Sequence, residues 1–342
     1  MHKNSPHSLH KKTVSVVGAR GYSGLELVRL LLKHPQVTLT HCFATKEFQL
    51  SDDMFDFPGH LVKCLAEDKL EANLTDIVFL ATPAEVSLEL APKILKAGKT
   101  VIDLSGAFRL KKHNTEDWYG FSKSPLMADY GLSPFCGPLN NGNKLISNPG
   151  CYATAVSLAL IPLLKHDLIA TEGLVIDAKS GTTGAGRKAS EAQLFAEVDG
   201  ECLPYRIGRH QHLPEIQEAV EQFSGAAIDP HFVTHLLPVK RGITAGIYAK
   251  SKTTNIDAVT KAYAQEFGAY PLVRFGLNNP KLLQLKHVVG TPYTHIHYNM
   301  VGDKLYVFAQ IDNLLKGAAS QAVENLNRLL DLAPHHSLQG EG

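Results

Sequence analysis

Short apolar runs alternate with amphipathic stretches along the first 104 residues of the chain. The runs at 13–17, 37–44, 77–81 and 100–104 are rich in branched aliphatic residues, which is typical of buried strands. Apolar positions within 25–32 and 84–97 have the spacing of a helix face, and Gly98 is a natural helix end. This alternation predicts an α/β fold with a Rossmann-type, doubly wound parallel sheet.

The pattern differs in the second half of the chain. One helical stretch, 256–267, lies among strand-like runs at 174–178, 232–239, 243–250, 294–301 and 305–311. These runs predict a second, α+β domain with a mixed or antiparallel sheet. We place a first domain at 12–150, joined by a C-terminal helix at about 314–333, and a second domain at 151–313. The stretch 50–75 looks irregular, and 110–146 is interpreted as a covering loop.

Cys151 opens an apolar run, 155–164, whose composition suits a buried helix, and it follows Pro149 and Gly150. A thiol at a helix start faces unpaired backbone N–H groups and the positive end of the helix dipole, and both favour the thiolate. Cys151 is therefore a candidate nucleophile. The alternative is that it packs as a small apolar side chain, as most free cysteines do.

A glycine-rich turn follows the first predicted strand and opens the first predicted helix. Strand, glycine turn and helix form the context of a dinucleotide-binding fingerprint, although the spacing is G-x-x-G-x-x-G. Glycines let the backbone approach a pyrophosphate, and the helix start supplies N–H donors to it. A plain strand-to-helix turn is the alternative. The candidate cofactor residues of this turn are Gly18, Arg20, Gly21, Tyr22, Ser23 and Gly24.

Lys46 lies just beyond the second predicted strand, where the ribose of a dinucleotide would lie. NAD-binding units place an acidic residue there, whereas a cation suits the 2′-phosphate of NADP. Lys46 therefore favours NADP, although Glu47 is its neighbour and a surface lysine is often only solvated.

The strand at 100–104 leads to Ser105, Gly106 and Arg109 at the carboxyl edge of the sheet, where ligands of such folds bind. Arg109 could present its guanidinium fork to a phosphate or carboxylate, or it could form a structural ion pair. Ser105 and Gly106 could line the cofactor. The small-residue loop at 179–188 could bind an anion through its backbone and hydroxyl donors, or act as a flexible linker.

His210 and His212 form a dense imidazole pair ahead of Glu215. Three interpretations are open: unremarkable histidines, a metal site, or a base that serves Cys151. The metal site lacks a further ligand cluster in the sequence, so we predict no metal. If the segment is extended, residues two apart point to opposite faces and only one imidazole can face the thiol. His212 could pair with Glu215 where a helix begins near Pro214.

Composition narrows the class of protein. A hydrophobic content of 44%, a charged content of 20% and a formal net charge of +1 indicate a soluble globular protein without a nucleic-acid-binding surface. No apolar run reaches the roughly 18 residues of a membrane helix, and no secretory signal is evident at the start. The cysteines at 42, 64, 136, 151 and 202 lack C-x-x-C spacing, so we expect a reducing, cytoplasmic setting.

Together these motifs resemble the N-acetyl-gamma-glutamyl-phosphate reductase family, enzymes of arginine biosynthesis that reduce an acyl phosphate to an aldehyde. The resemblance covers nearly the whole chain and rests on the segments 18–24, 148–152, 178–181, 210–216, 238–243 and 312–317. It implies NADP as cofactor, an acyl phosphate as substrate, inorganic phosphate as product, and a homodimer or homotetramer. The first domain then binds NADP, and the second carries catalysis, substrate binding and oligomerisation.

The resemblance also implies a mechanism. The Cys151 thiolate attacks the acyl phosphate, a thioester forms, and hydride from NADPH reduces it to the semialdehyde. His210, in preference to His212, moves the protons, with Glu215 orienting the pair. Thr82 and Asn313 join the cofactor residues on this basis. The residues assigned to the substrate are Arg109, Asn148, Ser180, Gly181, Glu215 and Arg241.

Three positions depart from the usual family pattern: Gln211, the pair Thr182-Thr183, and Ala153. None removes a reacting group, so they affect substrate contacts and not the reaction. Two alternatives remain. One is a sister reductase acting on aspartyl phosphate or on a carrier-bound aminoadipyl group, and the other is a non-catalytic dinucleotide-binding protein.

Overall fold

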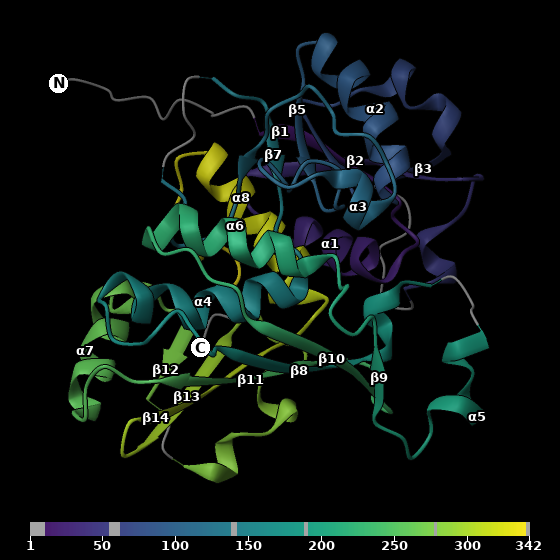
Figure 1. The fold of residues 1–342 in the computed structure, drawn as a ribbon. Helices are drawn as coiled ribbons and strands as arrows, with labels where there is room; N and C mark the ends of the chain where they lie inside the picture. The colour runs from purple at the N-terminus through teal and green to yellow at the C-terminus, as the bar shows by residue number, and fades with distance from the viewer. Residues whose placement is uncertain (1–10, 55–61, 138–141, 188–190, 277–278, 340–342) are drawn as a thin grey trace, which may run out of the picture.

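A computed structural model describes residues 11–54, 62–137, 142–187, 191–276 and 279–339. The chain forms two seven-stranded sheets, one built before residue 150 and the other after it (Figure 1). Lys188, a cation of the predicted anion-binding loop, lies outside the described residues.

The first sheet is parallel throughout, in the order β3-β2-β1-β4-β5-β7-β6. The strand order reverses between β1 and β4, and the crevice at such a switch point binds the ligand in doubly wound folds. The predicted doubly wound sheet is therefore confirmed. Its strands are β1 (Lys12–Val17), β2 (Val37–Ala44), β3 (Lys63–Ala66), β4 (Ile77–Leu80), β5 (Thr100–Asp103), β6 (Asp129–Tyr130) and β7 (Leu145–Ser147).

Three of these strands lie in segments that looked irregular in sequence. β3 has 4 residues, β7 has 3 and β6 has 2, so each is too short to show a periodicity of its own. Each of these segments is a strand because its backbone pairs with that of a neighbouring strand. The segment 110–146 is therefore more than a covering loop, because it completes one edge of the sheet and also holds the short helix α3 (Thr115–Tyr119).

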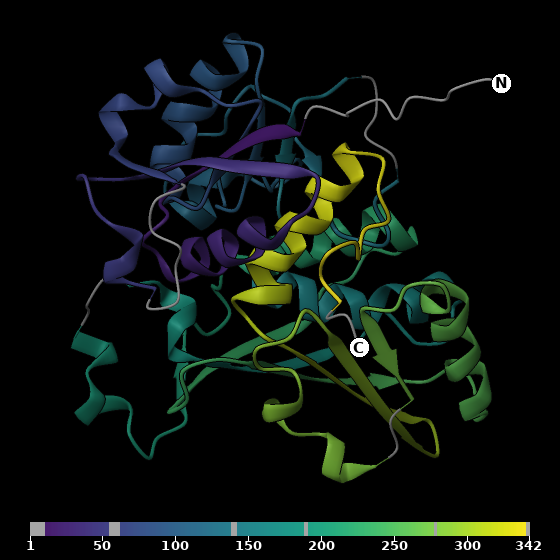
Figure 2. The same ribbon diagram turned by 180° about the vertical axis from the view of Figure 1, so that it is seen from behind.

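Two helices follow the strands closely, as the spacing predicted: α1 (Tyr22–Lys33) and α2 (Ala84–Lys96). The C-terminal helix α8 (Ser320–Leu329) packs against α1 and β5, so the end of the chain returns to the first sheet. In Figure 2 the yellow α8 lies beside the purple α1. A π-helical turn, Leu315–Ala319, leads into α8.

The second sheet is mixed, in the order β12-β13-β14-β11-β8-β10-β9. The predicted mixed or antiparallel sheet is confirmed. Its strands are β8 (Val175–Gly181), β9 (Leu203–Tyr205), β10 (His231–Leu237), β11 (Ile243–Lys250), β12 (Val273–Phe275), β13 (Thr294–Val301) and β14 (Lys304–Ile311). The helices of this half are α4 (Cys151–Lys165), α5 (Phe195–Val198), α6 (His212–Ser224) and α7 (Ile256–Phe267).

Helix α4 occupies the centre of the molecule. Every residue from 152 to 164 is buried, because α4 packs on β11 and β14 and is covered by α6 and the π-helical turn. Figure 1 shows α4 between the second sheet and α6. This burial explains the continuous apolar run, and it places Cys151 at the point where the two halves of the chain meet. Over the residues that the structure describes, no helix is both long enough and apolar enough to span a membrane.

Candidate active site

Cys151 is the first residue of α4 and is half-buried. Gly150 is the N-cap, and no side chain caps this helix start, so its backbone N–H groups are available to a ligand. A Cβ on Gly317 would lie 2.7 Å from the Cβ of Cys151, so the π-helical turn presses directly on the cysteine. Lys316 of that turn is fully buried and pairs with Glu324 of α8 at 2.8 Å. The turn therefore holds the cysteine backbone in one place.

The pKa of the Cys151 thiol is higher than the sequence led us to expect. Burial raises the pKa of Cys151 to about 11, although Arg109 and the backbone N–H of Tyr152 act in the opposite direction. Desolvation of a thiolate outweighs these favourable contacts. In the chain without ligands the thiol is therefore protonated at neutral pH, and a base has to take its proton before attack.

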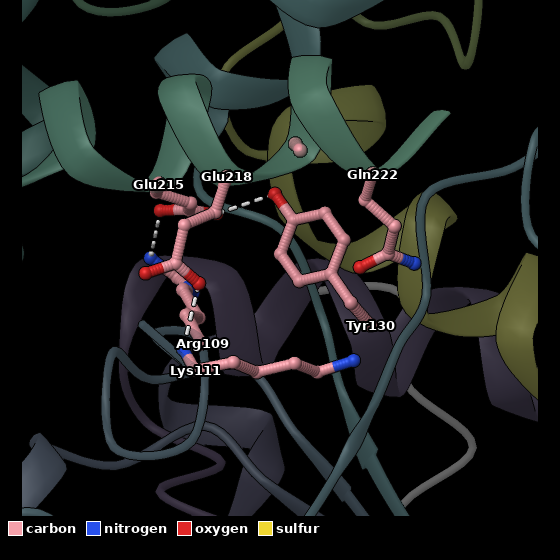
Figure 3. A pocket seen from close by; sticks show the side chains of 7 residues that line it. Arg109, Lys111, Tyr130, Glu215, Glu218 and Gln222 are labelled. Atoms are coloured by element: carbon pink, nitrogen blue, oxygen red, sulfur yellow. Dashed lines mark hydrogen bonds and ion pairs between the residues drawn. The ribbon is translucent and has the colours of Figure 1, made fainter. Parts of the chain in front are cut away.

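Glu215 of α6 anchors the turn that precedes the cysteine. One of its oxygens accepts the Gly150 N–H at 2.7 Å and the Tyr130 hydroxyl at 2.8 Å, and the other pairs with Arg109 at 3.4 Å. Figure 3 shows this carboxylate between Arg109 and Tyr130. Because the carboxylate is fully buried, these contacts stabilise it and make the position of Gly150 rigid.

Arg109 uses its guanidinium within the protein. Its Nε donates to the Asn148 carbonyl at 2.9 Å, its Nη2 donates to the Leu104 carbonyl at 2.7 Å, and its Nη1 faces Glu215. Burial tends to lower its pKa, but the nearby Glu215 carboxylate raises the pKa above its ordinary value. Arg109 therefore forms a structural ion pair, one of the two roles considered from the sequence, and its side chain also lies at the reacting end of the site.

Asn148, which the sequence assigned to the substrate, binds protein groups in this structure. Its amide donates to the Ala318 carbonyl at 3.1 Å and accepts from Asn325 of α8 at 3.0 Å. These contacts connect the residue three positions before Cys151 to the C-terminal helix. The loop that carries the nucleophile is thus held by α6 on one side and by α8 on the other.

The two histidines lie side by side. Their ring centroids are 4.8 Å apart, and the backbone N–H of His212 donates to Nδ1 of His210 at 3.1 Å. The condition under which they would point to opposite faces is not met, because the chain turns into α6 at His212 and is not extended there. The predicted proximity of His212 to Glu215 is present, with Nε2 4.0 Å from Oε2.

The contacts of the two imidazoles differ. A Cβ on Gly150 would overlap Nε2 of His212, which also lies 3.4 Å from Nη1 of Arg109. His210 instead packs edge-on against Tyr152, Tyr205 and Phe232. Sequence favoured His210 as the acid–base group, whereas these contacts place His212 beside the residue before the nucleophile.

Burial keeps both imidazoles neutral. It lowers the pKa of His210 to about 3 and the pKa of His212 well below 6.5, and the nearby Arg206 adds to both effects. Since Arg109 can only donate, Nε2 of His212 is an acceptor and its proton is on Nδ1, which is buried and has no partner among the described residues. The Nε2 lone pair, which faces Arg109, is therefore the position at which His212 could receive a thiol proton.

The glycine turn fits a dinucleotide. Gly18 has φ of 78°, and a Cβ on it would overlap the Ala81 carbonyl oxygen. A Cβ on Gly24 would overlap the carbonyl oxygen of Gly18, and Gly21 is the N-cap of α1 without a side-chain cap. The glycine turn therefore packs closely against the backbone that follows β4, and the start of α1 is open to a pyrophosphate.

The cations around this turn are partly exposed. Arg20 pairs with Asp53 at 2.8 Å, and Arg187 joins the same carboxylate at 2.9 Å. Tyr22 and Ser23 begin α1 beside the turn, and Tyr22 is exposed. Lys46 is exposed two residues beyond the end of β2. Lys46 is thus an exposed cation beyond β2, whereas Arg20 of the glycine turn is paired with Asp53.

A buried carboxylate organises the other predicted cofactor residues. Asp103, at the end of β5, accepts the Ser105 hydroxyl at 2.8 Å and the Ser87 hydroxyl at 2.7 Å. Ser87 in turn contacts the Thr82 hydroxyl at 2.8 Å. Gly106 follows Ser105, and a Cβ on it would overlap the ring of Tyr119. Thr82 and Ser105 therefore belong to one hydrogen-bonded network at the carboxyl edge of the sheet.

Arg241 connects the two halves of the chain. It pairs with Glu26 of α1 at 2.9 Å and with the fully buried Asp312 at 2.9 Å. Asn313 accepts the Gly242 N–H at 2.8 Å and donates to Thr183 at 3.0 Å. These contacts hold the loop after β14 against α1 and against the turn that follows β8. The guanidinium of Arg241 is thus bound by carboxylates of the protein.

Ser180 and Gly181 end β8. The Ser180 hydroxyl contacts the Gly181 carbonyl at 3.0 Å, and a Cβ on Gly181 would lie 2.7 Å from the backbone of Arg241. Close approach of two backbone segments explains the need for glycine here. Within the described ranges no group of three or more His, Cys, Asp or Glu residues is placed to hold a metal ion.

Comparison with known proteins identifies the family. Residues 13–146 match the model described as semialdehyde dehydrogenase, NAD binding domain, and 151–313 match semialdehyde dehydrogenase, dimerisation domain. The N-acetyl-gamma-glutamyl-phosphate reductase of Staphylococcus epidermidis is 39% identical over 331 residues, covering 93% of this chain and 95% of that protein. The chain belongs to the N-acetyl-gamma-glutamyl-phosphate reductase family. It is therefore an enzyme, an acyl-phosphate reductase with a site for a nicotinamide dinucleotide.

Other reductases of this family from Streptococcus mutans and Geobacillus stearothermophilus are 41% and 40% identical over 330 residues, each covering 93% of this chain and 95% of the relative. Solved structures share the fold. Aspartate semialdehyde dehydrogenase II of Vibrio cholerae superposes with a TM-score of 0.72 at 17% identity, covering 94% of this chain and 99% of that one. Family membership thus decides against a non-catalytic binding protein.

Several residues of this acyl-phosphate reductase site were not predicted from sequence. Tyr130, Asp103 and Gly317 contribute to the site only through tertiary contacts, and no local sequence pattern indicated this role for them. Glu218 belongs with them, since its carboxylate accepts the backbone N–H groups of 111, 112 and 113. Its position three residues after Glu215 on the same helix face was the available signal.

Proposed function

We propose that the chain reduces N-acetyl-gamma-glutamyl phosphate to N-acetylglutamate semialdehyde, with NADPH, in arginine biosynthesis. The observation that carries this proposal is the convergence of Cys151, His212 and the Arg109–Glu215 pair at the start of α4. The names of relatives at 39–41% identity over nearly the full length support the acyl group. The aspartate-type relatives share only the fold.

The chain's own residues account for the covalent steps. His212 takes the thiol proton of Cys151, and the thiolate attacks the acyl carbon. The bond from that carbon to the phosphate oxygen breaks, His212 returns the proton to the departing phosphate, and a thioester remains. The N–H groups at the start of α4 stabilise the oxyanion.

When bound, the nicotinamide dinucleotide supplies the hydride that reduces the thioester carbon. The carbon–sulfur bond then breaks, and the thiolate recovers a proton from solvent.

His210, which sequence preferred, takes a supporting part in this proposal. Its Nδ1 accepts the His212 N–H, and its ring packs against Tyr152 of α4. It therefore orients His212 toward the nucleophile without itself touching Gly150.

NADP is the proposed form of the cofactor. Two observations support this form: Lys46 is exposed beyond β2, and Arg20, although paired with Asp53, lies in the glycine turn, since cations near this edge favour a 2′-phosphate. We also propose residues 12–150 with α8 as the cofactor-binding unit and 151–313 as the catalytic and oligomerisation unit of a cytoplasmic homodimer or homotetramer. The acyl phosphate and inorganic phosphate are its partners.

The reverse reaction provides the test. The purified chain is assayed with phosphate and NADP⁺ against N-acetylglutamate semialdehyde, aspartate semialdehyde and the carrier-bound aminoadipate semialdehyde. We expect a kcat/KM at least about a hundredfold higher for the first, since the protein loses interactions with each wrong acyl group. A higher value for either competitor would contradict the proposed substrate.

A further inference from the structure

A pocket of about 370 Å³ opens beside the histidine pair. Its walls come from the start of α2, from α3 and from the segment between β9 and α6. Its lining includes Trp118, Tyr119, Arg206, Arg209 and Gln211, and also one carboxylate, Glu85 of α2. The mechanism described above uses none of them.

The pocket adjoins residues of the reacting centre. Gln211 stands between the two histidines and is the N-cap residue of α6. Tyr119 of the pocket wall also packs against Gly106, where a Cβ would overlap its ring. Burial lowers the pKa of both imidazoles, and the charge of Arg206 lowers it further. A ligand in this pocket would therefore lie next to the histidine pair.

The two arginines of the pocket are not held in ion pairs. Among the described residues no carboxylate lies within ion-pair distance of Arg206 or Arg209, and both are exposed. Arg209 lies over the Trp118 ring, 5.9 Å from its centroid. Arg206 has φ of 47°, a left-handed conformation that is strained in a residue with a side chain. Such strain points to a role in function.

We propose that Arg206 and Arg209 bind the α-carboxylate of the acyl substrate, an assignment that rests on the proposed function. That substrate carries one carboxylate, at the end remote from the reacting carbonyl. Guanidinium groups recognise a carboxylate through paired, charge-assisted hydrogen bonds. The aromatic wall of Trp118 and Tyr119 suits the methylene and acetyl groups, and the Gln211 amide is placed to meet the acetamido group.

A phosphate could use the same guanidinium groups, so the test separates the two sources. N-acetylglutamate semialdehyde is compared with 4-acetamidobutanal, the same chain without its carboxylate, in the reverse reaction. The variants are Arg206→Gln, Arg209→Gln and the charge-preserving Arg206→Lys. Arg274→Gln is the matched control, since it removes the same charge from a residue of β12 that stacks on the Tyr293 ring and does not line the pocket.

We expect the ratio of kcat/KM for the two aldehydes to fall at least about tenfold in each glutamine variant, as loss of a charged hydrogen bond predicts. Arg206→Lys restores part of the ratio, and Arg274→Gln leaves it unchanged. An unchanged ratio in both glutamine variants would overturn the assignment. A raised KM for phosphate or for NADP⁺ with an unchanged ratio would assign the arginines to that ligand instead. No turnover of either aldehyde by the unaltered chain would overturn the proposed function first, and this assignment with it.

Discussion

His212 lies directly against Gly150, so closely that a Cβ on this glycine would overlap Nε2 of the imidazole and would lie 2.7 Å from Nη1 of Arg109. The residue before the nucleophile therefore has to be glycine. Its N–H is meanwhile bound by Glu215 at 2.7 Å. One backbone unit thus brings together the base, the ion pair and the start of the helix that carries the thiol.

Cys151→Ala should abolish turnover and leave folding and NADP binding intact, because no other group can form the thioester. We expect a steady-state rate below about a hundredth of the unaltered rate, as for loss of a nucleophile. Cys202→Ala is the matched control, since Cys202 is exposed. Residual activity above that level in Cys151→Ala would exclude the covalent route.

His212→Asn should lower kcat by about a hundredfold or more with little change in KM, since removal of a general base acts on the chemical step. His210→Asn should lower kcat less, because asparagine can still accept the His212 N–H. Rate profiles against pH for both variants provide the measurement. A larger loss of kcat at His210 would return the acid–base role to His210, as sequence alone favoured.

Gly317→Ala should lower kcat, since the added methyl group would lie 2.7 Å from the Cβ of Cys151 and 3.1 Å from its Cα, so it would displace the nucleophile. Cofactor affinity should be unaffected, because the glycine turn is untouched. Gly137→Ala is the control, as nothing lies within 4 Å of a Cβ there. Equal kcat for the two variants would show that the contact has no influence on the thiol.

Lys46→Glu should raise the KM for NADPH far more than the KM for NADH, because the new carboxylate would repel a 2′-phosphate. Lys33→Glu, at the opposite end of α1 from the glycine turn, makes the same change of charge and should affect neither cofactor selectively. Parallel initial-rate measurements with both cofactors decide the point. Equal increases for NADPH and NADH in Lys46→Glu would place the specificity elsewhere.

Stability should fall as the pH drops below 6.5. Burial lowers the pKa of His210 to about 3, whereas the unfolded chain binds this proton near 6.5. Between these values the unfolded state binds more protons, so the free energy of unfolding decreases with falling pH. His210 alone contributes about 2 kcal/mol between pH 7 and pH 5.

Urea unfolding at pH 7 and pH 5 tests this contribution. The difference between the two pH values should be smaller in His210→Asn by about that amount, and unchanged in His231→Asn, since His231 is an exposed residue of β10. The same difference in His210→Asn as in the unaltered chain would show that His210 titrates normally in the folded state.

The sequence alone determined the parts of this protein that depend on local patterns. The alternation of apolar runs and helical spacing gave both sheets, and several bounds match the structure closely, such as 37–44 for β2 and 256–267 for α7. The glycine turn and the cysteine at a helix start are also local, because each needs only its neighbours in the chain. Family resemblance followed from the order of such motifs.

Only the tertiary structure decided which groups meet and how charged they are. β6 and β7 exist through pairing with their neighbours, and Tyr130 of β6 reaches Glu215 across 85 positions of sequence. The choice between His210 and His212 depended on where α6 begins, and the raised pKa of Cys151 depended on burial by elements distant in the chain. Desolvation and long-range contacts are properties of the packed molecule, so no local pattern encodes them.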